Sequence, residues 1–172
     1  MTTIKRVGVL AHPMRPRTAP IAEHIAETLR AHHLDVWSHT VWDEEDVRRQ
    51  ISDTDMVIAI GGDGAMLRAG RVCARDSVPV LGVNRGHLGF LTEVQDLDEW
   101  DETLAAVLSG NYWIEQRMMI RAAALRNGSG TRAAETSAGA SADRHGQRRS
   151  TAPRRRTLGR TTPQRALFPF GG

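Results

Sequence analysis

The sequence predicts an α/β protein with a Rossmann-like parallel sheet and flanking helices. Over residues 1–110, short apolar runs alternate with segments in which apolar residues recur at helical spacing. Continuous apolar runs are typical of strands buried on both faces, as parallel strands are. Two of these runs, Met56–Ile60 and Val80–Val83, end in glycine-rich turns. In open α/β sheets, ligands bind beside such turns at the carboxyl ends of the strands.

The first half of the domain contains two expected strands and two expected helices. The strands are Arg6–Ala11 and Leu34–Trp37. Between them we expect a helix capped by Thr18, with Pro20 in its first turn, because both residue types favour helix starts. The charged segment Asp43–Ile51 is expected to form a short surface helix.

The second half repeats this alternation. Strand Met56–Ile60 is followed by a helix over Ala65–Ala74, and strand Val80–Val83 by a turn. A last helix is expected to begin at Asp96, where an acidic residue recurs three positions later, and to end at Gly110. The buried face of this helix is expected to consist of Trp100, Leu104, Val107 and Leu108.

A second, β-rich domain is expected to begin at residues 111–125 and to be truncated. Ile114, Met118 and Ile120 share one parity there, as in a strand. Residues 126–172 contain no Ile, Val, Met, Trp, Tyr or Cys. Without large apolar side chains a segment cannot offset the entropy of ordering, about 1–2 kcal/mol per residue. We therefore expect a disordered tail, and exposed apolar surface on the unpartnered strand.

The charge divides at the same place. Residues 1–125 contain 13 Lys and Arg against 18 acidic residues, whereas residues 126–172 contain ten Arg and two acidic residues. The run Arg154–Arg156 can bind polyanions through phosphate charge, but no aromatic residue is interleaved to stack on bases. We expect no specific nucleic-acid partner. The tail is either a natural basic extension or the product of a shifted reading frame in GC-rich DNA.

Composition excludes several other classes of protein. Cys73 is the single cysteine, so no internal disulfide is possible, and we expect an inert thiol within a helix. The histidines His32, His33 and His39 have no cysteine or carboxylate at zinc spacing beside them, so no resident metal is expected. The apolar run at Arg6–Ala11 is too short for a signal peptide or a membrane span. These features indicate a cytoplasmic protein without a membrane partner.

The turn Gly61-Gly62-Asp63-Gly64 carries the strongest indication of chemistry. Its glycines let a ligand approach the backbone, and the free N–H groups of the following helix attract phosphate. The carboxylate of Asp63 opposes an anion, which suggests that it also accepts a proton from a hydroxyl or holds a metal. A plain turn is the alternative. Neither Gly-x-Gly-x-x-Gly nor a Walker phosphate loop is matched, because Leu67 stands where the former needs glycine.

A second segment makes the interpretation more specific. Gly82–Leu91 reads Gly-Val-Asn-Arg-Gly-His-Leu-Gly-Phe-Leu, and Met66-Leu67-Arg68 follows the first turn. Together with the first strand ending in His12-Pro13 and the later Glu115–Met119, these segments closely resemble the NAD kinase family over roughly residues 5–125. His87 within the second segment either touches a phosphate or faces solvent.

The resemblance implies transfer of the ATP γ-phosphoryl group to the 2′-hydroxyl of the adenosine ribose of NAD, giving NADP. Asp63 matches the general base on that hydroxyl, and Mg²⁺ or another divalent cation would accompany ATP. Members of the family are homo-oligomers, an assembly that a truncated second domain puts in doubt for this chain. The residues that the resemblance assigns to nucleotide binding are Gly61, Gly62, Gly64, Arg68, Asn84 and Phe90, with Phe90 close to the adenine.

The sequence departs from the family pattern in two respects. Ala65 replaces the more common threonine, a mild change. More seriously, the family's second domain supplies an Asn-Glu or Asn-Asp pair that grips the NAD ribose, and no such pair occurs after Leu125, where Asn127 is the only asparagine. We therefore expect impaired activity. The alternative is a non-catalytic nucleotide-binding protein with a basic tail.

Overall fold

The computed structural model describes most of the first 119 residues and short parts of the remainder. The described residues are 4–12, 14–85, 90–119, 122–124, 156–158 and 162–169. They divide into two compact units, one formed by residues 1–117 with 163–172 and the other by residues 118–162. The candidate site lies in the first unit.

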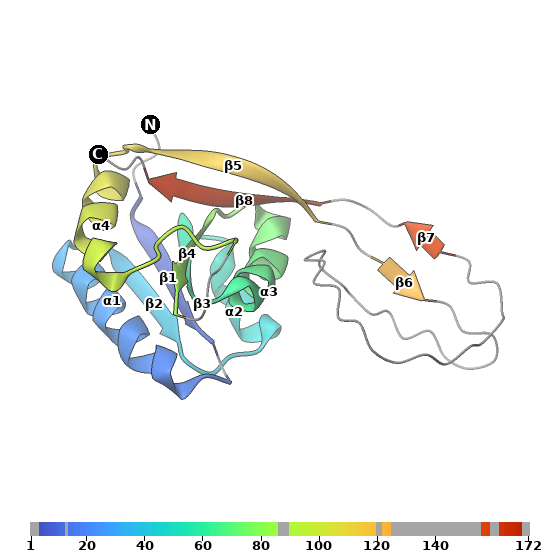
Figure 1. The fold of residues 1–172 in the computed structure, drawn as a ribbon, viewed down its shortest axis with the longest axis horizontal. Helices are drawn as coiled ribbons and strands as arrows, with labels where there is room; N and C mark the ends of the chain where they lie inside the picture. Colours follow the sequence, from blue (N-terminus) through green and yellow to red (C-terminus); the bar gives the residue numbers. More distant parts are fainter. Residues whose placement is uncertain are drawn as a thin grey trace. The chain divides into compact units, whose positions relative to one another are not determined.

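A six-stranded sheet forms the centre of the first unit (Figure 1). Its strands are β1 (Arg6–Ala11), β2 (Asp35–His39), β3 (Met56–Gly61), β4 (Val80–Asn84), β5 (Tyr112–Met119) and β8 (Thr162–Pro169). They are ordered β2-β1-β3-β4-β8-β5. β1 pairs parallel to both β2 and β3, and β4 pairs parallel to β3. The parallel sheet that the alternating apolar runs predicted is therefore confirmed.

Helices cover both faces of this sheet. They are α1 (Ala19–Ala31), α2 (Glu44–Ile51), α3 (Asp63–Cys73) and α4 (Trp100–Leu108), with short 3₁₀ turns at Pro16–Thr18, Ala74–Asp76 and Leu97–Glu99. One core cluster joins α1 and α4 to alternate strand residues such as Val9 and Ile58. A second cluster joins α2 and α3 to the intervening residues, among them Leu10 and Val57. Because successive side chains of a strand point to opposite faces, the continuous apolar runs bury both layers.

The strand register brings three strand ends to one edge of the sheet. Ala11 of β1 pairs with Ile60 of β3, and Gly61 pairs with Asn84 of β4. The backbone continues this alignment beyond the strands, since the Arg85 amide donates to the Gly61 carbonyl at 2.9 Å. The turns that follow β1, β3 and β4 therefore meet at the carboxyl edge, where the glycine-rich motifs predicted a ligand.

Several local expectations were wrong in detail. Thr18 precedes α1, but its side chain makes no capping bond. Instead its hydroxyl donates to the Arg15 carbonyl at 2.7 Å and accepts from the His12 amide at 3.1 Å. Thr18 therefore ties the end of β1 to the start of α1. Leu108 is 36% exposed, so only the other three expected residues of the α4 face are buried.

The segment after residue 125 also differs from the expectation of disorder, for the part that is described. Thr162–Pro169 forms strand β8 beside β4, with Val80 opposite Ala166. Ala166 and Leu167 are fully buried, and Leu167 joins the cluster under α1 and α4. The edge of β4 supplies backbone partners that no local sequence pattern reveals. In the second unit, β6 (Ala122–Ala124) pairs antiparallel with β7 (Arg156–Leu158).

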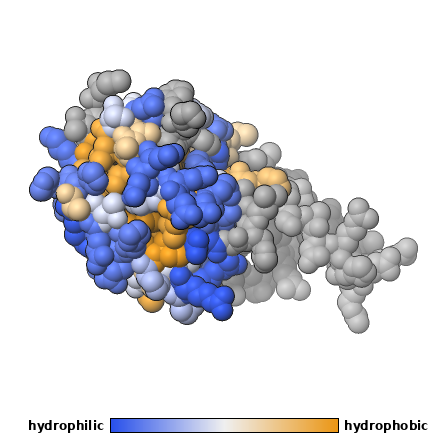
Figure 2. Space-filling view, turned by 60° about the vertical axis from the view of Figure 1, so that its left-hand side comes forward, coloured by the Kyte–Doolittle hydropathy of each residue, from blue (hydrophilic) through white to orange (hydrophobic). Residues whose placement is uncertain are grey.

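The surface on the side of α1 and α4 is mostly hydrophilic, with apolar residues emerging between the charged ones (Figure 2). Among the described residues, no helix has the length and apolar character needed to cross a membrane.

Cys73 is buried in α3, and burial raises the pKa of its thiol far above the ordinary value. The expectation of an unreactive thiol within a helix agrees with this environment.

Candidate functional site

The turn between β3 and α3 can be built only with glycine at its first position. Gly61 has φ of +154°, which side-chain-bearing residues rarely adopt, and a Cβ there would lie 2.7 Å from the Cβ of Ala65. A Cβ on Gly62 or Gly64 would instead have no atom of the described residues within 4 Å. Two glycines of the turn thus face open space, which leaves room for a ligand beside the first turn of α3.

Asp63 joins the two glycine-rich segments. It lies in the first turn of α3, two residues earlier than the expected helix start. Its Oδ1 accepts hydrogen bonds from the amides of Phe90 at 3.0 Å and Leu91 at 2.9 Å. The carboxylate is therefore held in one orientation by backbone from the turn after β4. The sequence singled out both segments, and the structure brings them into contact through this residue.

β4 packs closely against α3 and against the segment that follows the second turn. A Cβ on Gly82 would lie 2.8 Å from the Met66 sulfur and 2.9 Å from Thr92 Cα, so only glycine fits. Asn84 is buried, and its side-chain amide donates to Gln95 Oε1 at 2.8 Å. The Phe90 side chain is 82% exposed. Residues 86–89, including His87, lie outside the described residues.

Arg68 projects from α3 toward a tryptophan that sequence reasoning did not single out. Its Nη2 donates to the Trp42 carbonyl at 2.8 Å, and its guanidinium carbon lies 4.3 Å from the centre of the Trp42 ring. Trp42 Nε1 in turn donates to the carbonyl of Ala11 at the end of β1. Arg68, which the resemblance assigned to NAD binding, therefore also connects α3 to the end of β1.

His12 is a further residue at this edge, and its position in the sequence marked it only as the end of a strand. A Cβ on Gly61 would lie 3.6 Å from His12 Cβ, which places the histidine beside the turn. Burial, followed by the positive charges of Arg15 and Arg68, lowers the pKa of His12 below its ordinary value. Its Nδ1 accepts from the Met14 amide at 3.2 Å, so the neutral ring carries its proton on Nε2. His12 can therefore donate a hydrogen bond to an anionic ligand.

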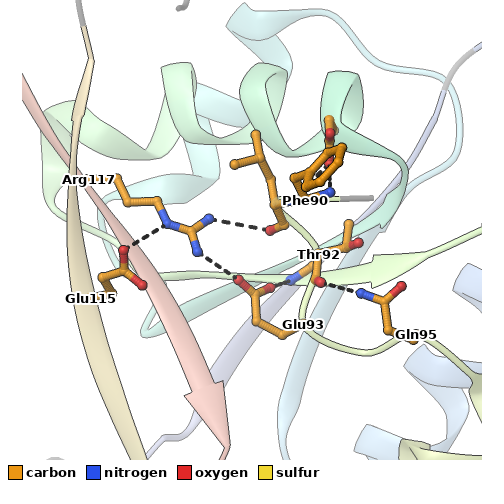
Figure 3. Close-up of polar contacts among 9 residues, drawn as sticks. Phe90, Thr92, Glu93, Gln95, Glu115 and Arg117 are labelled. Atoms are coloured by element: carbon orange, nitrogen blue, oxygen red, sulfur yellow. Dashed lines mark hydrogen bonds and ion pairs between the residues drawn. The ribbon is translucent and has the colours of Figure 1, made fainter. Parts of the chain in front are cut away.

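An ion pair between Glu93 and Arg117 contacts β4 and the segment that follows the second turn (Figure 3). Glu93 has a 3% exposed side chain, and its Oε2 accepts from the Gly82 amide at 2.8 Å. Arg117 of β5 lies with Nη2 3.7 Å from Glu93 Oε1 and donates through Nη1 to the Leu91 carbonyl at 3.5 Å. No motif in the sequence indicated this pair, because its members come from two segments that meet only in the folded chain.

Comparison with protein families decides the classification. The model of the ATP-NAD kinase N-terminal domain matches residues 7–112 of this chain. The chain belongs to the ATP-NAD kinase family. The matched region includes both glycine-rich turns and ends at the first residue of β5. The resemblance inferred from the motifs is thereby confirmed.

Relatives within the ATP-NAD kinase family include proteins of several bacteria. The NAD kinases of Pseudomonas putida (strain W619) and Azotobacter vinelandii are 41% identical over 108 residues and 46% identical over 99 residues. These matches cover 62% and 57% of this chain, but 33% and 30% of the relatives. The chain thus spans about a third of the length of these curated relatives.

Solved structures of ATP-NAD kinases share the fold. An NAD kinase from Archaeoglobus fulgidus in complex with ATP is 22% identical with a TM-score of 0.53, and a yeast NADH kinase complexed with NADH is 18% identical with a TM-score of 0.55. Each match covers 72% of this chain and 49% or 41% of the solved chain. At these identities the similarity establishes the α/β architecture of the described residues.

Proposed function

We propose that this chain provides the nucleotide-binding part of an NAD kinase, in which Asp63 is the base that accepts the proton of the 2′-hydroxyl of NAD. The observation that carries the proposal is the fixed Asp63 carboxylate, held by the amides of Phe90 and Leu91 at the carboxyl edge of a parallel sheet. Family membership supports the reaction, the phosphorylation of NAD by ATP.

The chemistry suits a fixed carboxylate. A ribose hydroxyl is a weak nucleophile, and phosphoryl transfer depends mainly on positioning, a proton acceptor and stabilisation of charge. A general base typically contributes about 10²–10⁴-fold. The open side of Gly62 and Gly64 leaves space for the ribose and phosphates beside the start of α3. In this arrangement Gly61, Gly62 and Gly64 contact the nucleotide through backbone, while Arg68, Asn84 and Phe90 border it.

We propose that a divalent cation enters this site together with ATP. Among the described residues, no group of three or more His, Cys, Asp or Glu side chains could hold a metal ion. Mg²⁺ in kinases is commonly bound by one or two carboxylates together with the phosphates of the substrate. We propose that Asp63 is the carboxylate nearest to such an ion, whose contribution is to neutralise charge on the phosphates.

We further propose that the 172-residue chain binds nucleotides but forms NADP slowly. The family's ribose-gripping Asn-Glu or Asn-Asp pair does not occur after Leu125. Calorimetric titration with NAD and Mg²⁺-ATP, together with an assay of NADP formation, tests this. Binding with little turnover is expected. Robust NADP formation would contradict the impaired site, and a lack of all nucleotide binding would contradict the proposed function.

The role of Asp63 can be tested without turnover. Asp63→Asn keeps an oxygen that accepts from the two amides but removes the charge that would repel the 2′-phosphate of NADP. Like charges a few ångströms apart repel by several kcal/mol even at an effective dielectric of about 20, so NADP affinity should rise roughly tenfold or more. NAD affinity should fall. Asp76→Asn, at an exposed carboxylate beyond α3, is the matched control. Unchanged NADP affinity in Asp63→Asn would remove Asp63 from the ribose site.

The alternative, a non-catalytic nucleotide-binding protein, predicts a different combination of results. Such a protein would bind ATP, but Asp63→Asn would not distinguish NAD from NADP. The two functions are therefore separated by the same titrations.

A further inference from the structure

The orientation of the Asp63 carboxylate depends on residues 90–95, and this segment is in turn held by contacts with β4 and β5. Residues 90–95 cross the carboxyl edge of the sheet and supply the two amides that bind Asp63 Oδ1. Val94 is buried in the core cluster under α1 and α4, but Phe90 is largely exposed and Leu91 is only partly buried, so apolar packing is weak at the two residues that bind Asp63. Polar contacts therefore add to this packing in fixing the Phe90 and Leu91 end of the segment.

One anchor attaches the segment to β4. The amides of Glu93 and Val94 both donate to the Gly82 carbonyl, at 3.1 and 3.0 Å. The Glu93 carboxylate closes the same contact from the other side, because its Oε2 accepts from the Gly82 amide at 2.8 Å. Since a Cβ on Gly82 would lie 3.0 Å from that oxygen and 2.9 Å from Thr92 Cα, the glycine permits this approach.

A second anchor comes from β5. Arg117 points toward the segment and donates to the Leu91 carbonyl, while its Nη2 faces Glu93 Oε1 (Figure 3). That Oε1 atom is buried and has no hydrogen-bond partner among the described residues, so Arg117 is the cation that compensates it. Glu115 is a second carboxylate near Arg117, at 3.3 Å from Nε, and its side chain is 49% exposed.

We propose that Glu93 and Arg117 are positioning residues that hold the segment 90–95 so that the amides of Phe90 and Leu91 keep the Asp63 carboxylate in place. The chain of contacts runs from Glu93 to Arg117, to the Leu91 carbonyl, and through the neighbouring amides to Asp63. This inference rests on the proposed function for its meaning in catalysis. The positioning itself can be measured without substrate.

Amide hydrogen exchange of the full chain, followed by NMR, tests the positioning. In Arg117→Ala, exchange at Phe90 and Leu91 should accelerate roughly tenfold, as expected for the loss of one hydrogen bond to a charged group. Amides of β1 serve as the internal reference and should stay protected. Glu115→Gln is the matched control, because it alters the exposed partner of Arg117 and leaves the Leu91 and Glu93 contacts intact. An equal acceleration in β1 would assign Arg117 to overall stability and overturn the proposal.

The pH profile of the unmodified protein provides a second readout. Burial raises the pKa of Glu93 to about 7, against the opposing effects of the Gly82 amide and Arg117. The charged groups that face it are Arg117, which favours the ionised form, and Glu115, which opposes it. Opening that exposes Glu93 to water returns its pKa to the ordinary, lower value, so the closed segment binds the proton more tightly than the open one. Protection of the Phe90 and Leu91 amides, corrected for intrinsic exchange, should therefore decrease as pH rises through about 7.

The variant Glu93→Gln tests whether the pH dependence of amide exchange results from ionisation of Glu93. The variant retains an oxygen for the Gly82 amide but cannot ionise, so the pH step at Phe90 and Leu91 should disappear. A flat profile in the unmodified protein, or the same step in Glu93→Gln, would overturn the proposal. Because exchange is measured without nucleotide, the result is independent of whether the chain forms NADP. A chain that fails the Asp63 titrations can still pass this test.

Discussion

At the scale of single residues, substitutions of Gly61 and Gly64 should have opposite effects on stability. Gly61 is needed for its backbone conformation, whereas Gly64 leaves room for a ligand. Gly61→Ala should lower the free energy of unfolding by about 1–3 kcal/mol, because the new Cβ meets Ala65 at an unfavourable φ. Gly64→Ala should raise it by about 0.5–1 kcal/mol, since alanine favours the helix and meets no atom of the described part of the chain within 4 Å.

Urea denaturation measures both changes, and nucleotide titration then assigns the second glycine. Gly64→Ala should weaken nucleotide binding although the fold is stabilised, because its methyl group enters the open side of the turn. Unaltered nucleotide affinity in this variant would indicate that the ligand approaches elsewhere.

Glu93 predicts a pH dependence of stability with a definite sign. Burial raises its pKa to about 7 from an ordinary 4.5, so the folded state binds this proton more tightly than the unfolded state. The contribution of Glu93 to stability is therefore present below pH 4.5 and is lost as pH rises through about 7. Its size is at most about 3 kcal/mol.

Chemical denaturation between about pH 4.5 and 8 provides the measurement, with Glu93→Gln as the variant that should lack this component. The difference in unfolding free energy between the unmodified protein and the variant should change by the stated amount across this range. A difference that is constant with pH would contradict the titration of a buried Glu93.

At the scale of elements, strand β8 offers the sharpest test. Leu167 is fully buried against the layer of α1 and α4, so Leu167→Ala should cost about 2–5 kcal/mol in unfolding free energy. Arg165→Ala, at a half-buried position on the same strand, should change it by less than about 0.5 kcal/mol. Equal, small effects in thermal and urea unfolding would instead favour the disordered tail that composition indicated.

The elements differ in how far local sequence could predict them. α2 was predicted closely, because Asp43 accepts from the Glu45 and Asp46 amides as an N-cap. β3 and β4 were predicted within one residue, since their apolar runs are uninterrupted. β8 was missed because its composition contains Thr, Pro, Gln and Arg, and its burial depends on the free edge of β4.

At the scale of the whole molecule, β5 is the last strand in the sheet order and leaves apolar side chains exposed. Trp113 and Ile114 are 44% and 40% exposed. An edge strand with exposed apolar residues favours association with other chains. We expect concentration-dependent self-association in light scattering, reduced by Ile114→Lys. Val41→Lys, at a valine outside β5 that is 77% exposed, is the control and should leave the association unchanged.

The composition of residues 126–172 leads to a prediction about the coding DNA. If these residues result from a shifted reading frame, another frame downstream of Leu125 should encode a β-rich segment with an Asn-Glu or Asn-Asp pair. Translation of the two remaining frames checks this directly. The absence of such a segment from both frames would favour a natural basic tail.

The parallel α/β class, the two glycine-rich turns and the resemblance to NAD kinases could all be inferred from the amino-acid sequence. They could be inferred because apolar runs, glycines and an N-cap act over a few neighbouring residues. The atoms that hold Asp63, the stacking of Arg68 on Trp42 and the meeting of Glu93 with Arg117 became visible only in the folded chain. Those contacts join residues 24 to 28 positions apart. Such pairs have no local signal, because the strand register and the crossover connections set their proximity.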